Sequence, residues 1–169
     1  MIMASESKIK AIYITINGIT DPLGQSQVLT YIKDLSKHGV AFYLISLEKN
    51  IKEAEKLSEQ LAGLNITWYR LKYFRFYFFG MALNVIQCFL VALFLVVSKK
   101  PDIIHARAYP PMFSIFLLKK IFNTFLLKKL FNIKIIFDIR GFWPEQLNEY
   151  KKIKNNSIYY KILKFLEKK

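Results

Sequence analysis

The sequence has one cysteine, two histidines and few acidic residues. Because Cys88 is alone, no disulfide can form within the chain, and no oxidising compartment is required. We expect no secretory signal, since MIMASESKIK leads directly into a strand-like run rather than an apolar core with a cleavage site. No cluster of carboxylates or histidines has the spacing of metal ligands, so the sequence predicts no metal site.

Acidic residues are outnumbered, with 12 Asp and Glu against 26 Lys and Arg, which gives a net charge of +14. Residues 99–169 hold 16 basic and 5 acidic residues, a net of +11, whereas residues 1–98 hold 10 and 7, a net of +3. This balance predicts attraction to phosphates, nucleic acids or anionic lipid head groups. Because no nucleic-acid-reading motif accompanies the charge, we expect no nucleic-acid partner. Lysine-rich, solvated helices are the alternative interpretation.

The hydrophobic fraction of 53% can form a core, and the length of 169 residues suits one domain or one lobe of a larger protein. Strand-like and helix-like segments alternate, which predicts an α/β fold with a Rossmann-like parallel sheet and flanking helices. We expect residues 1–8 to be a disordered tail and residues 9–169 to form the domain. The expected strands are Ile9–Ile16, Ala41–Leu47, Ile66–Leu71, Asp102–Arg107 and Lys134–Ile139, and the expected helices include Ser26–His38 and Ile51–Gly63.

The segment Tyr73–Val97 is long and apolar enough to be considered as a membrane span. Gly80, Asn84 and Gln87 interrupt it, and the uninterrupted part is too short to cross a bilayer. Three interpretations stay open: a membrane span, a helix that dips into one face of a membrane, and a buried crossover helix.

Three loops follow strands at the carboxyl edge of the expected sheet, where ligands of such folds bind. The loop Asn17–Gln25 (NGITDPLGQ) joins a strand to a helix N-terminus, which can offer backbone N–H groups to an anion. His105 and Arg107 close the fourth strand, and both can point at the crevice. The stretch Phe137–Gln146 (FDIRGFWPEQ) brings an acid, an arginine and aromatic residues together directly after a buried strand.

Thr20–Gly39 (TDPLGQSQVLTYIKDLSKHG), Pro101–Pro111 (PDIIHARAYPP) and Ile135–Gln146 (IIFDIRGFWPEQ), in this order and at these separations, resemble the N-terminal domain of bacterial family 4 glycosyltransferases. That family has the GT-B architecture, in which two Rossmann-like domains face each other across a cleft. The resemblance spans about residues 9–165. It implies a hexosyltransferase type of glycosyltransferase whose N-terminal domain binds the acceptor and whose C-terminal donor domain is absent from this chain.

The resemblance implies sugar transfer from a nucleotide-sugar substrate to a glycan or lipid-linked acceptor in bacterial surface polysaccharide synthesis. It implies no cofactor, a cytoplasmic location that is peripheral at the inner face of the membrane, and no activity of the isolated chain. Alternatives are a non-catalytic module that binds a membrane surface and an inactive truncated product. The expected catalytic residues are Asp138, Arg140 and Glu145, and the expected substrate-binding residues are Gly18, Asp21, Gly24, Gln25, His105, Arg107 and Trp143.

Two neighbouring segments, Phe116–Thr124 (FLLKKIFNT) and Phe125–Ile133 (FLLKKLFNI), match at seven of nine positions. In a continuous helix of about 100° per residue the second copy would face the opposite way from the first. No single apolar face would then form, which argues against a dedicated membrane helix. The pattern indicates an in-frame duplication, with a helix break expected at Asn123–Thr124.

Overall fold

The structure is a computed structural model that describes residues 9–75, 77–124 and 133–140. The chain divides into two units, Met1–Asp138 and Ile139–Lys169. Every helix and strand below belongs to the first unit, and of the second unit only Ile139 and Arg140 are described. The tail expected at residues 1–8 lies outside the described residues.

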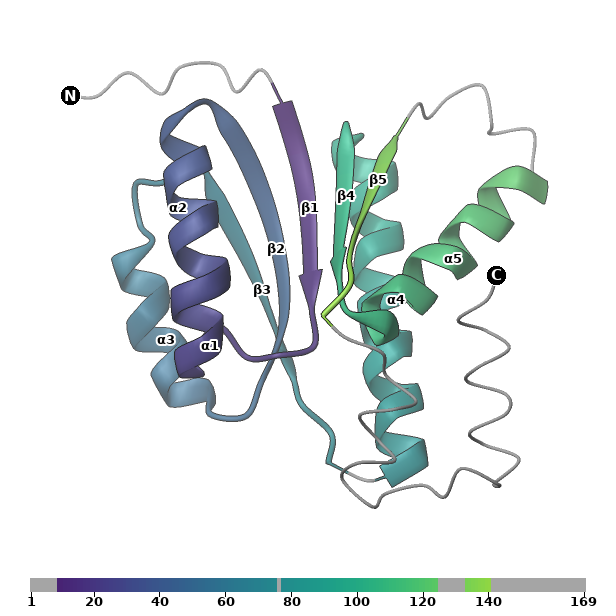
Figure 1. The fold of residues 1–169 in the computed structure, drawn as a ribbon, viewed down its shortest axis with the longest axis horizontal. Coiled ribbons are helices and arrows are strands. Elements are labelled where there is room, and N and C mark those ends of the chain that lie inside the picture. The colour runs from purple at the N-terminus through teal and green to yellow at the C-terminus, as the bar shows by residue number, and fades with distance from the viewer. Residues whose placement is uncertain (1–8, 76, 125–132, 141–169) are drawn as a thin grey trace. The chain divides into compact units, whose positions relative to one another are not determined.

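Within the first unit, β-branched and aromatic runs form one sheet of five parallel strands in the order β3-β2-β1-β4-β5 (Figure 1). The predicted α/β, Rossmann-like fold is therefore confirmed. The strand order reverses direction between β1 and β4, so the crevice outside their carboxyl ends is the position where such sheets bind ligands. The strands are β1 Ile9–Thr15, β2 Val40–Glu48, β3 Ile66–Lys72, β4 Ile103–Arg107 and β5 Lys134–Asp138.

The first crossover helix begins earlier than the sequence predicted, at Pro22 instead of Ser26. Proline favours the first helical position because its fixed φ suits the helix and its missing N–H would have no partner there. The helix continues through α1 Pro22–Gly24, a π turn η1 Gln25–Leu29 and α2 Thr30–Lys37. Gln25 is therefore a helical residue rather than a loop residue.

The remaining helices connect the other strands, and two of them have clear end signals. Asn50 caps the third helix, with its Oδ1 accepting from the backbone N–H of Glu53 at 3.4 Å. Gly39 and Gly63, at φ 87° and 86°, follow the ends of α2 and of that helix, close to the expected helix ends at His38 and Gly63. The helices are α3 Ile51–Gln60, α4 Tyr77–Lys99 and α5 Tyr109–Thr124.

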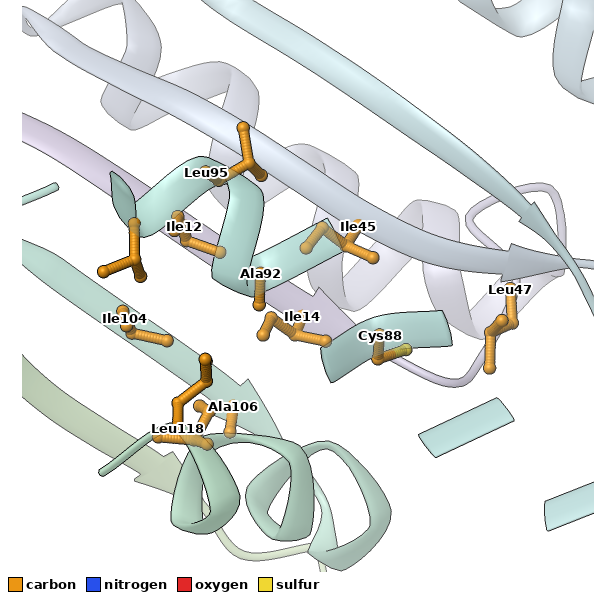
Figure 2. Close-up of a cluster of buried hydrophobic side chains, with 12 residues drawn as sticks. Ile12, Ile14, Ile45, Leu47, Cys88, Ala92, Leu95, Ile104, Ala106 and Leu118 are labelled. Carbon is orange, nitrogen blue, oxygen red and sulfur yellow. The ribbon is translucent and has the colours of Figure 1, made fainter. Parts of the chain in front are cut away.

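Alternate residues of the strands supply two separate cores, one on each face of the sheet. The η1–α2 segment and α3 cover the face that carries Tyr13 and Leu44. The helices α4 and α5 cover the opposite face, which carries Ile12 and Ile14. Figure 2 shows this second core, where Cys88, Ala92 and Leu95 of α4 lie against the strand side chains.

The Tyr73–Val97 segment becomes the crossover helix α4 between β3 and β4, and its polar interruptions face the protein. Asn84 is 1% exposed, and its side chain accepts from the Phe74 N–H and donates to the Phe74 carbonyl, both at 3.0 Å. Gln87 donates to the carbonyl of Lys72 at 3.2 Å. A Cβ on Gly80 would lie 2.7 Å from the Phe74 carbonyl oxygen, so glycine allows this close approach.

The first copy of the near-repeat is the second half of α5. Within this copy Leu118 is buried in the core under α4. Directly before it, Ile115 is buried in the same core, and the Ser114 hydroxyl donates to the carbonyl of Val85 on α4 at 2.9 Å. The described part of α5 runs to Thr124, where the described residues stop, so the break expected at Asn123–Thr124 stays a prediction. Most of the second copy lies outside the described residues.

Burial raises the pKa of the Cys88 thiol to about 12 from an ordinary value of 9.0. We therefore expect Cys88 of the folded chain to react with a thiol reagent about five hundredfold more slowly than an exposed cysteine at about pH 9, because its thiolate fraction falls from about one half to about one thousandth. The reaction can be followed by absorbance with a chromogenic disulfide. The urea-unfolded chain is the control and should react at the ordinary rate. Reaction of the native chain at that same rate would show that Cys88 of α4 is not buried against the sheet.

Candidate functional site at the carboxyl edge of the sheet

The sheet face under α2 and α3 changes from apolar to polar toward the carboxyl ends of the strands. The strand register aligns residues of neighbouring strands in rows that cross the sheet, and the side chains of one row point to the same face. The preceding row, which includes Tyr13, His105 and Leu44, is aromatic and aliphatic. The last row that crosses all five strands is called the polar row below and consists of Arg70, Ser46, Thr15, Arg107 and Asp138.

Arg107 occupies the place in the polar row where the strand order reverses. It ends β4 opposite Thr15 of β1, and its side chain is almost completely buried, with 4% exposed. Its Nη2 donates to Oε1 of Gln27 on η1. Its Nε and Nη1 are buried and have no hydrogen-bond partner among the described residues. A guanidinium with open donors is costly to bury, so this arrangement fits an anion-binding site.

The buried carboxylate of Glu48 holds the loop that follows β1. Glu48 is 1% exposed at the end of β2. Its Oε1 accepts from the Ile19 N–H at 2.7 Å and from the Ser46 hydroxyl at 2.6 Å. Its Oε2 accepts from the Thr20 hydroxyl at 2.7 Å and from the Thr20 N–H at 3.3 Å. Two of the loop N–H groups that the sequence offered to an external anion, those of Ile19 and Thr20, are therefore bonded to an internal carboxylate.

Sequence reasoning missed Glu48 because the expected second strand ended one residue earlier, at Leu47. The signal was an acidic residue directly after a buried parallel strand. In dinucleotide-binding Rossmann domains an acidic residue in this position hydrogen-bonds a ribose hydroxyl. Here the same position binds backbone of the same chain, and the Trp68 Nε1–H extends the network by donating to Ser46 Oγ at 2.7 Å.

Gly18 and Gly24 are required by packing within the loop. A Cβ on Gly24 would lie 2.1 Å from the Gly18 carbonyl oxygen and 2.8 Å from the Ile19 Cα, so a side chain would push the backbone apart. A Cβ on Gly18 would lie 2.8 Å from Glu48 Oε2. Their predicted part in substrate binding stays a prediction.

Asp21 and Gln25 brace the start of the helix. Asp21 forms an ion pair with Lys49, with Nζ and Oδ2 2.6 Å apart at the surface. Gln25 donates from Nε2 to the Thr20 carbonyl at 3.1 Å. Gln25 also lines an open groove of about 460 Å³ along the outer side of the helix, together with Pro22, Ser26, Leu29, Thr30 and Lys33.

His105 lies one row before Arg107 and packs among aromatic rings. Its ring centroid is 4.5 Å from that of Tyr13 on β1 and 6.2 Å from that of Tyr31 on α2. The predicted pair His105 and Arg107 therefore shares one face of β4, but only Arg107 reaches the polar row.

Asp138 ends β5 beside Arg107 in the polar row, and its carbonyl accepts from the Ala108 N–H at 2.9 Å. Ala108 has φ 71°, a left-handed conformation that a non-glycine residue seldom adopts and that often marks a functional edge. Arg140 is exposed and belongs to the second unit. The predicted residues Trp143 and Glu145 lie outside the described residues.

Comparisons with protein-family models, with curated proteins and with solved structures find no match to this chain. In the described part of the chain, no group of three or more His, Cys, Asp or Glu side chains is placed to hold a metal ion. The site is therefore interpreted from its own chemistry: a buried guanidinium with open donors, at the strand-order reversal, beside a loop that an internal carboxylate holds in place.

The Glu48→Ala variant tests how far the loop depends on this carboxylate. We expect the free energy of unfolding to fall by about 2–4 kcal/mol, because the Ile19 and Thr20 N–H groups lose a charged acceptor. Urea unfolding followed by circular dichroism measures the change. The matched control is Glu55→Ala on the exposed side of α3, which should change stability by less than about 0.5 kcal/mol. Equal effects of the two substitutions would contradict a special role for Glu48.

Proposed function

We propose that this chain is the acceptor-side domain of a family 4 glycosyltransferase of GT-B architecture. The proposed reaction transfers a sugar from a nucleotide-sugar to a glycan or lipid-linked acceptor in bacterial surface polysaccharide synthesis. Three sequence stretches that resemble that family support it, and two of them carry Arg107 and Asp138. The single observation that carries it is Arg107, a buried arginine with open donors at the strand-order reversal.

The chemistry of sugar transfer explains why such an arginine is useful. The oxygen of an acceptor hydroxyl forms a bond to the anomeric carbon while the bond from that carbon to the diphosphate oxygen breaks. Negative charge grows on the departing nucleoside diphosphate. A planar guanidinium donates two parallel hydrogen bonds to phosphate oxygens, and its attraction for them is stronger in a buried site than in water.

The hydroxyl proton must go to a base, and Asp138 is the candidate. It is the neighbour of Arg107 in the polar row and ends the adjacent strand at the same edge of the sheet. Parallel strands present their carboxyl ends together, so an acceptor held at this edge can meet both side chains. Glu145 is the second proposed acid–base residue and Arg140 and Trp143 are further proposed contacts, on the strength of the sequence alone.

A non-catalytic module that binds a membrane surface is the second candidate. One observation favours it: the side of α4 that faces away from the sheet is apolar and exposed. The two candidates differ in their need for Arg107, because a module that only docks on lipid gains nothing from a buried guanidinium with open donors.

Binding of inorganic pyrophosphate tests the proposed diphosphate site. We expect isothermal titration calorimetry to show that Arg107→Gln raises the Kd at least about tenfold, since hydrogen bonds to charged groups contribute about 1.5–3 kcal/mol. Arg70→Gln is the matched control, because Arg70 lies in the same row but is exposed at the edge strand. It should change the Kd less than about twofold.

A nucleotide-sugar should compete with pyrophosphate for the same site if the site serves sugar transfer. If Arg107→Gln and Arg70→Gln lowered the affinity for pyrophosphate equally, the binding would be due to the general positive charge of the chain and not to a site at Arg107. Absence of pyrophosphate binding by the unmodified chain would contradict the proposal, provided that circular dichroism shows it to be folded.

A further inference from the structure

The helix α4 has two apolar sides, and the sheet covers only one of them. Cys88, Ala92, Leu95 and Val96 are buried against β1, β2 and β4. The other side is exposed, and from Phe79 to Val97 every exposed side chain on it is apolar. This surface, called the α4 stripe below, consists of Phe79, Ala82, Leu83, Ile86, Leu90, Phe94 and Val97.

The extent of the α4 stripe is unusual for a surface that meets water. Its members recur every three or four residues along a helix of 23 residues, which corresponds to a length of about 35 Å. Phe79, Leu90 and Phe94 are 80%, 56% and 58% exposed. A water-facing helix side normally carries polar or charged residues, and a long exposed apolar surface marks an interaction site.

The polar residues Asn84 and Gln87 of α4 do not lie in the α4 stripe, because their side chains face the rest of the domain. Asn84 and Gln87 are bonded to backbone groups of the segment that leads into the helix. The helix is long and apolar enough to cross a membrane by length and composition. Because its inner side forms part of the core in Figure 2, crossing a bilayer would dismantle that core. The helix can instead lie along a membrane surface.

Basic residues at both ends of the stripe indicate which surface it meets. Arg75 precedes the helix, Lys99 ends it and Lys100 follows it, and all three are exposed. The net charge of +14 opposes close approach of a second copy and favours an anionic surface. Lysine and arginine beside an interfacial helix attract anionic lipid head groups while the apolar side enters the acyl boundary.

We propose that the α4 stripe docks the domain on an anionic lipid surface, with α4 parallel to the membrane plane. The docking does not rest on the proposed sugar transfer, because it needs neither Arg107 nor a substrate. It holds the domain at a lipid surface, where the lipid-linked acceptor of the proposed function would be within reach. The lipid partner recognised is any phospholipid with an anionic head group, not one particular species.

Flotation of the full chain with vesicles tests this proposal. We expect the chain to float with vesicles that mix phosphatidylglycerol with phosphatidylcholine and to float much less with pure phosphatidylcholine. Leu90→Gln with Phe94→Gln should reduce the partition coefficient at least about tenfold, since two large apolar side chains lose their place in the interface. The matched control is Leu23→Gln with Ile51→Gln, which changes two exposed apolar residues outside α4 and should leave flotation within about twofold.

Two further double variants test the role of the basic residues at the ends of the α4 stripe. Arg75→Gln with Lys99→Gln should weaken flotation more than Lys52→Gln with Lys56→Gln, which removes the same charge from α3. Circular dichroism of every variant confirms folding. Unchanged flotation of the Leu90 and Phe94 variant would overturn the proposal. Equal flotation on neutral and anionic vesicles would also overturn it. A third contrary result would be light scattering that shows a dimer of the unmodified chain and a monomer of the Leu90 and Phe94 variant, because the stripe would then bind a second copy.

Discussion

The carboxylate of Glu48 is the interaction on which the arrangement of the site depends. It accepts four hydrogen bonds, and the three from Ile19 and Thr20 join the end of β2 to the loop after β1. The loop in turn sets where the helix from Pro22 begins, and Gln27 on that helix meets Arg107. A buried acid therefore determines how the first crossover lies over the end of β4. Its burial is tolerated because four hydrogen bonds satisfy its two oxygens.

Arg107 is the opposite case, a buried charge whose donors are not all used. Most buried arginines are paired, because leaving N–H groups without a partner costs free energy. Such a cost is typical of positions that are retained for binding or catalysis rather than for folding. Within the polar row its neighbour Thr15 on β1 is neutral and its neighbour Asp138 on β5 is acidic, so the guanidinium supplies the positive charge at the strand-order reversal. A diphosphate group carries the negative charge and the paired oxygen acceptors that would complete its hydrogen bonds.

Much of this fold is readable from the sequence, because β-branched runs mark the strands and Gly39 and Gly63 mark two helix ends. Less of the site can be predicted from the sequence. Whether Arg107 has partners depends on strand register and on Gln27 80 residues away, and no local pattern encodes either. Glu48 was missed because a one-residue error at a strand end moves a side chain from the site to an ordinary loop. In α4, composition shows that both sides are apolar, but only packing shows which side the sheet covers.

The central claim is that Arg107 serves to bind an anion and does not stabilise the fold. Urea unfolding of the unmodified chain and of Arg107→Met, each with and without pyrophosphate, tests it directly. Without the anion, we expect the variant to be at least as stable, by as much as about 1–3 kcal/mol, because unsatisfied buried donors are removed. Pyrophosphate should stabilise only the unmodified chain. A variant that is clearly less stable in anion-free buffer, with no effect of pyrophosphate on either protein, would show that Arg107 is a structural residue and contradict the account.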